Sequence, residues 1–176
     1  ALAAVKTGKP AKLVYDRDED MRVTGKRHDF QISYDVGFTN DGKILALNVE
    51  QFLRCGMSFD LSAAIADRAM MHAENAYFIP DMRVTASLCK THTPSNTAFR
   101  GFGGPQGIMG MERIIDDVAA TLGLDPLVIR QRNFYPDKGT SESGKPTPYG
   151  QPVTDCVIGQ LVDRLSRDAH YQTRRL

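Results

Sequence analysis

The sequence predicts an α+β fold in which a mixed or antiparallel sheet packs against helices. Two strand patterns follow each other directly, and a third stands alone further along the chain. Helical patterns lie mainly after the strands and do not alternate with them, which distinguishes this chain from a parallel α/β protein. The strand patterns cover residues 30–38, 45–49 and 82–88, and the main helical patterns cover 61–75, 108–122 and 126–133.

Length and composition limit the classes of protein to which the chain can belong. With 176 residues and 41% hydrophobic residues, the chain is long enough to bury a core. The net charge of +1 gives no reason to expect a nucleic acid or an acidic membrane as partner. There is no apolar run of about 20 residues that could span a membrane, and there is no signal-peptide pattern.

The two ends of the chain lack ordinary helix boundaries. Residues 1–10 resemble the last turns of an apolar helix that stops at Gly8 and Pro10, with nothing before Ala1 to begin it. The last residues, 163–176, end without a capping glycine. We therefore expect this chain to be a piece of a longer polypeptide.

A short strand is expected over Lys12–Tyr15, followed by acidic residues. These residues, at positions 16, 18 and 20, have the one-three-five spacing of a calcium loop. Met21 and Arg27 occupy the places where such a loop needs Gly and Glu, so a calcium site is excluded and a solvated acidic turn is expected.

A β-hairpin is predicted between residues 29 and 49. Apolar side chains alternate with polar ones along the first strand, and the turn sequence NDGK at 40–43 is a strong hairpin signal. One face of the first strand carries Phe30, Ile32, Tyr34, Val36 and Phe38, and the returning strand carries Leu45, Leu47 and Val49. We interpret this pair as scaffold.

A helix over Leu61–Asn75, with Asp60 as its N-cap, places a charge on an apolar face. At 3.6 residues per turn, Arg68 falls on the same stripe as Ile65 and His72. Arg68 could form an internal salt bridge or extend to the edge of the face, or it could line a pocket and meet a ligand oxygen. No second histidine has metal-ligand spacing from His72, so a packed core histidine is expected there.

The most distinctive stretch is PSNTAFRGFGGPQG at 94–107, which leaves the strand at 82–88 and begins a helix. Gly101, Gly103 and Gly104 permit a positive φ angle and close approach of a ligand to the backbone. Unpaired N–H groups are expected at the start of the helix, where an anion or an electron-rich cofactor could bind. The loop matches neither the dinucleotide-binding nor the P-loop pattern. Arg100 and Phe102 project between the glycines, which a plain structural turn would not require.

The remaining elements are expected to support this loop. The predicted helix over 108–122 carries an apolar stripe on one face and ends at Gly123. Asp125 and Pro126 begin a second helix, which runs to about Asn133. The stripe consists of Ile108, Met111, Ile115, Val118, Ala119 and Leu122. We divide the chain into 1–135 with the hairpin, helices and loop, a surface loop at 136–153, and a terminal helix at 154–176. Thr154 or Asp155 should cap that helix, with inward-facing Ile158, Leu161, Val162 and Leu165.

The three cysteines, Cys55, Cys89 and Cys156, are odd in number and widely spaced. They suit neither a disulfide framework nor a zinc or iron–sulfur site, and we expect inert thiols in a reducing compartment. No nucleophile and base stand in a motif context, and no side-chain metal ligands are predicted. The residues favour a chain that binds and orients, with the difficult chemistry left to a cofactor.

SNTAFRGFGGPQG at 95–107 resembles the molybdenum-cofactor loop of the xanthine dehydrogenase/xanthine oxidase family of molybdenum hydroxylases. The stretches DRDEDM at 16–21, RCG at 54–56, ADRAM at 66–70 and MERIIDDVAATLGLDP at 111–126 agree with it. The resemblance covers nearly the whole chain and fades after about Pro136. It implies a cytoplasmic oxidoreductase that hydroxylates purines, from hypoxanthine and xanthine to urate, at a molybdenum–molybdopterin centre.

The resemblance also implies roles for individual residues. Arg100, Gly101, Gly103 and Gly104 would bind the cofactor, Arg100 largely through its backbone. Phe102 would hold the flat substrate by ring contact. An Arg at the position of Arg68 contacts the purine in xanthine-oxidising relatives, whereas aldehyde-oxidising relatives tend to carry a different residue there.

The family also needs parts that this chain does not contain. A substrate-binding Glu should lie just before Ala1, and the catalytic Glu should lie well beyond Leu176. The 2Fe-2S clusters and FAD would belong to other domains or subunits of an oligomer, with NAD as electron acceptor. No catalytic residue is therefore expected within these 176 residues, and the piece alone should be inactive.

Two other functions remain open at this point. The same chemistry could act on aldehydes or N-heterocycles. An Arg68 side chain that faces away from the pocket would favour this alternative. The chain could also belong to a non-catalytic subunit that kept the fold and lost the cofactor.

Overall fold

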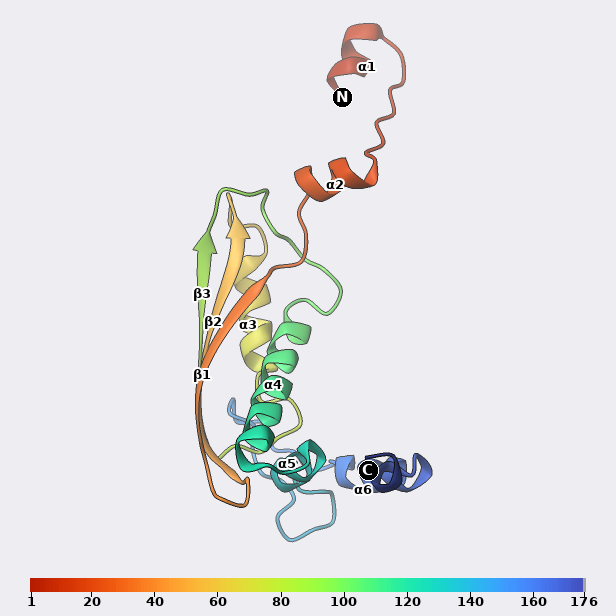
Figure 1. The fold of residues 1–176 in the computed structure, drawn as a ribbon. Coiled ribbons are helices and arrows are strands. Elements are labelled where there is room, and N and C mark those ends of the chain that lie inside the picture. Colours follow the sequence, from red (N-terminus) through yellow and green to blue (C-terminus); the bar gives the residue numbers. More distant parts are fainter. Residues whose placement is uncertain (176) are drawn as a thin grey trace.

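A computed structural model describes residues 1–175 and confirms the α+β prediction. In the described part, one mixed sheet with the strand order β1-β2-β3 is covered on one face by helices α3 and α4 (Figure 1). The strands are β1 (Phe30–Phe38), β2 (Ile44–Gly56) and β3 (Asp81–Lys90). None of the helices in residues 1–175 combines the length and the apolar character that a membrane crossing requires.

The hairpin forms where it was predicted, with β1 and β2 antiparallel. Along β1, half-buried residues alternate with exposed ones, in the predicted phase. A register shift between Gly37 and Phe38 pairs Phe38 with Ile44. This shift buries Ile44 completely and leaves Leu45 exposed, so the predicted inward position of Leu45 is wrong. Leu47 and Val49 are buried, as predicted.

Strand β3 runs parallel to β2, and the connection between them carries α3 (Ser62–Met71). Parallel neighbours need such a crossover, because a tight turn can join only antiparallel strands. The helix is shorter than predicted at both ends, and the predicted N-cap is wrong, because Leu61 occupies the N-cap position without a side-chain cap. The Asp60 carboxylate instead accepts a hydrogen bond from the Leu61 amide at 2.6 Å, just before the helix. This crossover places α3 on the same face of the sheet as α4, with the two helices in contact (Figure 1).

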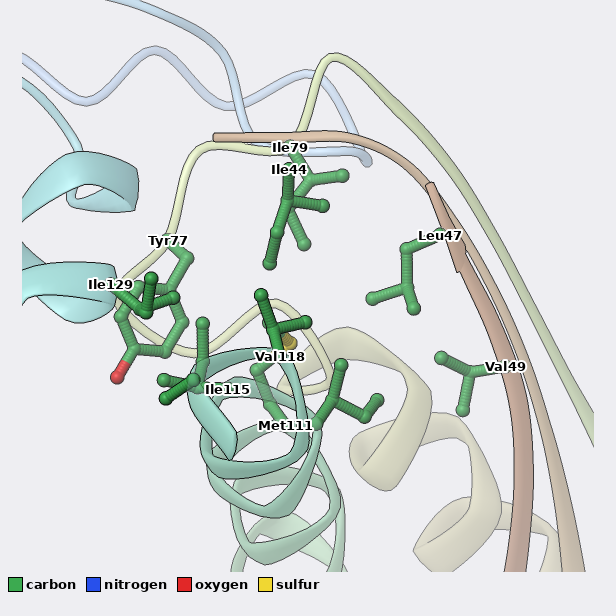
Figure 2. Close-up of a cluster of buried hydrophobic side chains, with 11 residues drawn as sticks. Ile44, Leu47, Val49, Tyr77, Ile79, Met111, Ile115, Val118 and Ile129 are labelled. Carbon is green, nitrogen blue, oxygen red and sulfur yellow. The ribbon is translucent and has the colours of Figure 1, made fainter. Parts of the chain in front are cut away.

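The main core lies between the sheet and α4 (Gly104–Leu122), as Figure 2 shows. The residues that α4 contributes are fully or almost fully buried and face apolar side chains from β2 and from the segment before β3. They are Met111, Ile114, Ile115, Val118 and Ala119. Ile108 is 37% exposed, so the prediction that it belongs to the buried stripe is wrong. The stripe begins one turn later, because the first turn of α4 packs through glycine.

Helix α5 (Pro126–Asn133) begins at the predicted cap, where the Asp125 carboxylate accepts a hydrogen bond from the Leu127 amide at 2.7 Å. Its last residue, Asn133, is completely buried and joins the helix to the hairpin. The Asn133 side chain accepts from the Ile44 amide at 2.8 Å and donates to the Gly42 carbonyl at 2.9 Å. It also donates to the Ile129 carbonyl at 2.8 Å. One amide side chain thus satisfies three buried backbone groups.

The first 25 residues extend away from the sheet (Figure 1). Helix α1 (Leu2–Thr7) ends at Gly8, as predicted. The strand predicted over Lys12–Tyr15 is wrong, since these residues are exposed coil without a partner strand in the described chain. The acidic turn is instead the start of α2 (Arg17–Val23), whose first amides are capped by the Asp16 carboxylate.

The residues after α5 form an irregular loop and then α6 (Ile158–Asp168) and α7 (Tyr171–Arg175). The predicted caps Thr154 and Asp155 are wrong, because the Asp137 carboxylate accepts from the Gly159 and Gln160 amides at 3.0 Å. Leu161 and Leu165 are 60% and 67% exposed, so their predicted inward position is wrong. The helix is amphipathic, but no other segment of residues 1–175 covers its apolar stripe.

We predict that Asn133→Ala lowers the free energy of unfolding by about 2–4 kcal/mol, because buried backbone groups lose their partners. Denaturant unfolding measures the change. Gln131→Ala, in the same helix but at an exposed position, is the matched control and should change stability by no more than about 0.5 kcal/mol. Equal effects of the two substitutions would contradict this role of Asn133.

Candidate functional site

The loop between β3 and α4 has three consecutive residues with positive φ angles. They are Gly101 at 86°, Phe102 at 50° and Gly103 at 94°. Glycine adopts this region freely, whereas a residue with a side chain costs on the order of 1 kcal/mol. Strained residues of this kind cluster at functional sites, where the surrounding structure maintains them. Phe102 is therefore a strained residue at the centre of the loop.

The Phe102 ring is anchored from one side. It is half-buried against a second apolar cluster, distinct from the main core. The buried members of this cluster are Leu53, Cys55, Ile65 and Ala66. The Phe102 amide also donates to the Phe99 carbonyl at 2.8 Å, which closes the turn. These contacts maintain the strained conformation and fix the direction of the ring.

Glycines bring the start of α4 against the backbone of α3. A Cβ atom on Gly103 would overlap the Ile65 carbonyl, and one on Gly107 would overlap the Ala69 carbonyl. Any larger residue at either position would push the two helices apart. The glycines that the sequence identified as loop-forming thus also determine the distance between α3 and α4.

The close approach brings Arg68 to the loop. A Cβ atom on Gly104 would lie 3.7 Å from the Arg68 Nε and 3.3 Å from the His72 Cδ2. Arg68 and Phe102 therefore lie on neighbouring elements at the same end of the helix pair. The predicted site residues Arg68, Arg100, Phe102 and the three glycines all gather here.

Arg68 is exposed, so its predicted place on the buried face of α3 is wrong. The buried face consists of Ser62, Ile65, Ala66 and Ala69, because these small residues permit close packing on α4 and the sheet. Within residues 1–175 no carboxylate pairs with the Arg68 guanidinium and no acceptor hydrogen bonds with it. The internal salt bridge that the sequence left open does not form in this part of the chain.

The start of α4 is less open than predicted. The Gly104 amide donates to the Gly101 carbonyl at 3.0 Å, and the Gln106 amide donates to the Gly103 carbonyl at 3.2 Å. Pro105 has no amide hydrogen. Among residues 98–103 of the described chain, the Phe102 amide has an acceptor, whereas the amides of the other five residues are without one. The donors that could meet a ligand are thus in the loop and not in the helix.

Arg27 supports the loop from outside, and sequence reasoning did not find it. Its Nη2 donates to the Arg100 carbonyl at 2.6 Å, and its guanidinium carbon lies 4.5 Å from the centroid of the Phe99 ring. The other terminal nitrogen, Nη1, is buried without a partner in residues 1–175. Arg27 lies in a short irregular segment before β1, where neither periodicity nor a motif indicates a role.

A second supporting contact involves Gln106 and His28. The Gln106 Nε2 donates to the His28 carbonyl at 3.1 Å, while its Oε1 is buried and unpaired within the described residues. The His28 ring forms a hydrogen bond with the Ser62 hydroxyl at 2.7 Å. Burial lowers the pKa of His28, although the nearby carboxylates of Asp60 and Asp29 oppose this effect. His28 is thus neutral at pH 7 and links the start of α3 to the start of α4.

The segment before the loop is tied to α3 by Asp60. This residue has a φ angle of 42°, and its carboxylate accepts from the Thr97 hydroxyl at 2.7 Å as well as from the Leu61 amide. These hydrogen bonds lower the pKa of Asp60. The site is therefore a preformed loop, anchored by α3, by α4 and by the segment before β1. Within residues 1–175, no cluster of His, Cys, Asp or Glu side chains could hold a metal ion.

Comparison with known proteins gives the class to which this fold and loop belong. Residues 1–134 match the family model of the molybdopterin cofactor-binding domain, and the chain belongs to that family. It is 44% identical over all of its residues to the xanthine dehydrogenase/oxidase of Mus musculus and 45% identical over 99% of them to the xanthine dehydrogenase of Drosophila subobscura. These relatives confirm the predicted resemblance to the xanthine dehydrogenase/xanthine oxidase family.

The chain spans only 13% of the length of these two relatives. Among solved structures, the aldehyde oxidoreductase from Desulfovibrio gigas superposes with a TM-score of 0.81 and 28% sequence identity. That match covers 96% of this chain and 18% of the other. Together with the family match over residues 1–134, this coverage shows that the chain corresponds to part of a molybdopterin-binding region.

We predict that Gly103→Ala lowers the free energy of unfolding by about 2–4 kcal/mol, since it adds both backbone strain and a clash with the Ile65 carbonyl. Gly123→Ala is the matched control. Its φ angle is 66°, but an added Cβ meets no atom within 4 Å, so only about 1 kcal/mol of strain is expected. Denaturant unfolding of both variants gives the comparison, and equal losses would show that close packing at Gly103 is unimportant.

Proposed function

We propose that this chain supplies cofactor and substrate contacts to a xanthine dehydrogenase, which hydroxylates purines at a molybdenum–molybdopterin centre. The observation that carries the proposal is Arg68, an arginine without a partner in residues 1–175, beside a loop that holds Phe102 in a strained conformation. High identity to xanthine dehydrogenases over the whole chain supports the purine substrate.

The loop residues Arg100, Gly101, Gly103 and Gly104 would hold the cofactor. Its fit is supported by the loop amides that have no acceptor in residues 1–175 and by the buried polar atoms of Arg27 and Gln106 beside the loop, which are unpaired in the same residues. When bound, the molybdenum cofactor supplies the hydroxylation chemistry.

Arg27 would position this part of the site. Its hydrogen bond to the Arg100 carbonyl orients the peptide that follows Arg100, and hence the start of the glycine sequence. The contact between its guanidinium and the Phe99 ring holds the same turn from its other end. A loop that is fixed before the cofactor binds loses little conformational freedom on binding.

Phe102 would hold the flat substrate by ring contact. Its position between two positive-φ glycines leaves the ring uncrowded by neighbouring side chains, while the second apolar cluster supports its other side. Aromatic rings stack on flat heterocycles with centroids about 4.5–7 Å apart. The aromatic face would thus orient the substrate relative to the cofactor.

Arg68 would contact an oxygen of the purine. An exposed guanidinium without a protein partner can donate to an oxygen that gains negative charge as the reaction proceeds. Such a contact, fixed in advance, stabilises the transition state more than the ground state, by about 2–4 kcal/mol for one donor group. The remaining partners would lie outside this chain: 2Fe-2S clusters, FAD, and NAD as electron acceptor, in an oligomeric cytoplasmic enzyme.

A second candidate is the same chemistry on an aldehyde or an N-heterocycle. The superposition on the Desulfovibrio gigas aldehyde oxidoreductase favours it, because the fold of this region serves that enzyme too. Arg68 distinguishes the two candidates, since an aldehyde has no second oxygen that would need a guanidinium.

We predict that Arg68→Met lowers kcat/KM for xanthine about 30- to 1000-fold in the complete molybdenum-loaded enzyme, which corresponds to the 2–4 kcal/mol above. Steady-state kinetics on xanthine and on an aldehyde measure the change. Arg113→Met is the matched control, because Arg113 is exposed on α4 and pairs with Asp117 one turn away. Its kcat/KM should remain within about twofold.

An unchanged kcat/KM in a folded, molybdenum-loaded Arg68→Met enzyme would contradict a purine contact by Arg68. Negligible xanthine turnover by the unmutated enzyme would favour the aldehyde or N-heterocycle candidate. Absence of molybdenum from the purified protein, under conditions where the cofactor is made, would indicate a subunit without catalytic function.

A further inference from the structure

A cavity of about 290 Å³ lies away from the loop, on the other side of His72. Three segments that are distant in sequence form it: the turn after α3, the residues after α5, and the irregular loop before α6. Its walls carry hydrogen-bonding groups from all three segments, including His72, Glu74, Tyr135, Thr147, Tyr149 and Gln151.

Glu74 is only 4% exposed. Burial raises its pKa to about 7, and the only opposing contribution comes from its own backbone amide. Within the described residues no side chain donates a hydrogen bond to this carboxylate. A buried carboxylate that no other residue pairs is costly, and such groups are normally paired or neutral.

Tyr135, across the same cavity, is 5% exposed, and its hydroxyl has no hydrogen-bond partner in residues 1–175. Burial and the charges of Glu74 and Tyr149 raise the pKa of this hydroxyl, so it is neutral and can accept or donate. Buried polar groups in folded proteins are rarely left unpaired. An unpaired buried hydroxyl and a buried carboxylate that only its own amide contacts, both on residues that line one cavity, indicate a site with a missing partner.

The missing partner should be positively charged. No Lys or Arg lines the cavity in the described chain, and the other ionisable side chains at its wall are His72, Tyr149 and Cys156. Lys145, which lies nearby, is 4.7 Å from the centroid of the Phe78 ring and pairs with Glu142 at 3.2 Å. Lys145 therefore already has partners, the Phe78 ring and the Glu142 carboxylate.

We propose that this cavity binds an organic cation, an alkylammonium or a guanidinium group, between the Glu74 carboxylate and the Tyr135 hydroxyl. Such a group donates several hydrogen bonds to both charged and neutral oxygens. The cation comes either from a free amine or from a lysine or arginine side chain elsewhere in the same enzyme.

A metal ion fits this cavity less well. Calcium and magnesium need about six oxygen ligands, often from several carboxylates, whereas Glu74 is the one carboxylate in the wall formed by the described residues. The volume is also several times the roughly 30 Å³ that one water occupies in the liquid, which suits a group larger than a bare ion.

Binding would join the three segments at one point. The occupant would fix the loop at 147–158 against the end of α3 and would contact the wall that includes His72. His72 in turn lies against Gly104 at the start of α4. The site is thus structurally connected to the loop, but it does not depend on the function proposed for that loop.

The test is thermal unfolding of the complete enzyme with n-butylammonium chloride at pH 8 and pH 5.5. Tetramethylammonium chloride at the same concentration, which has no N–H donors, is the control salt. A saturable rise in Tm of about 2–4 °C at pH 8, and a smaller one at pH 5.5, is expected, because the ligand pairs with ionised Glu74. Glu74→Gln, which keeps the shape of the side chain, and Tyr135→Phe should reduce the rise, whereas Glu142→Gln should not.

The sign of the Glu74→Gln effect without added amine identifies the source of the cation. An unpaired Glu74, with its raised pKa, costs stability as the pH rises from about 4.5 through 7, so Glu74→Gln should raise Tm at pH 8 if the site awaits a free amine. If a lysine or arginine of the enzyme fills the site, Glu74→Gln lowers Tm at pH 8 and added amine has no effect. A higher Tm of Glu74→Gln at pH 8, together with no effect of the amine on the unmutated enzyme, overturns the proposal.

Discussion

The close approach of α4 to the backbone of α3 is the constraint on which the rest of the site depends. It is possible only because Gly103 and Gly107 lack side chains at the contact points with the Ile65 and Ala69 carbonyls. Contact at this distance brings the end of α3, with Arg68 and His72, to the start of α4. The chain enters α4 through positive φ angles at residues 101–103, which include the strained conformation of Phe102. Gly103 belongs to both features, since it has a positive φ angle and also forms a contact point between the helices.

The main core and the supporting hydrogen bonds hold this arrangement in place. The apolar stripe of α4 fixes the far end of the helix on the sheet (Figure 2). At the near end, Asp60, His28 and Arg27 tie the loop and both helices to the segments around them. A site held by such contacts is formed before its ligand arrives, which is the arrangement that favours tight binding and an oriented reaction.

Several predictions from local signals are confirmed. The alternation along β1, the NDGK turn, and the Asp125–Pro126 start of α5 each depend on neighbouring residues, and each prediction is confirmed. The glycine-rich loop was found for the same reason, because three glycines around Arg100 and Phe102 form an unusual local pattern.

The local pattern at Lys12–Tyr15 failed, but most errors concern contacts between distant segments. The helical periodicity alone placed Arg68 on the buried face of α3. In the structure, the buried face of this helix is the one that carries Ser62 and the alanines, because this face packs on α4. Leu161 and Leu165 form a correct helical stripe, but whether such a stripe is covered depends on surfaces outside its own sequence. Arg27 gave no signal, because its partner is a backbone carbonyl far along the chain. The roles of Arg68, Arg100, Phe102 and the loop glycines in binding remain predictions.

The most direct test of the central claim is a crystal structure of the molybdenum-loaded enzyme with a slowly reacting purine bound. The account predicts that the Arg68 guanidinium lies within hydrogen-bond distance of a purine oxygen and that the Phe102 ring contacts the heterocycle. It also predicts that residues 101–103 keep their positive φ angles, with the loop against the cofactor. A purine bound elsewhere, with Arg68 directed into solvent and the loop away from the cofactor, would contradict it.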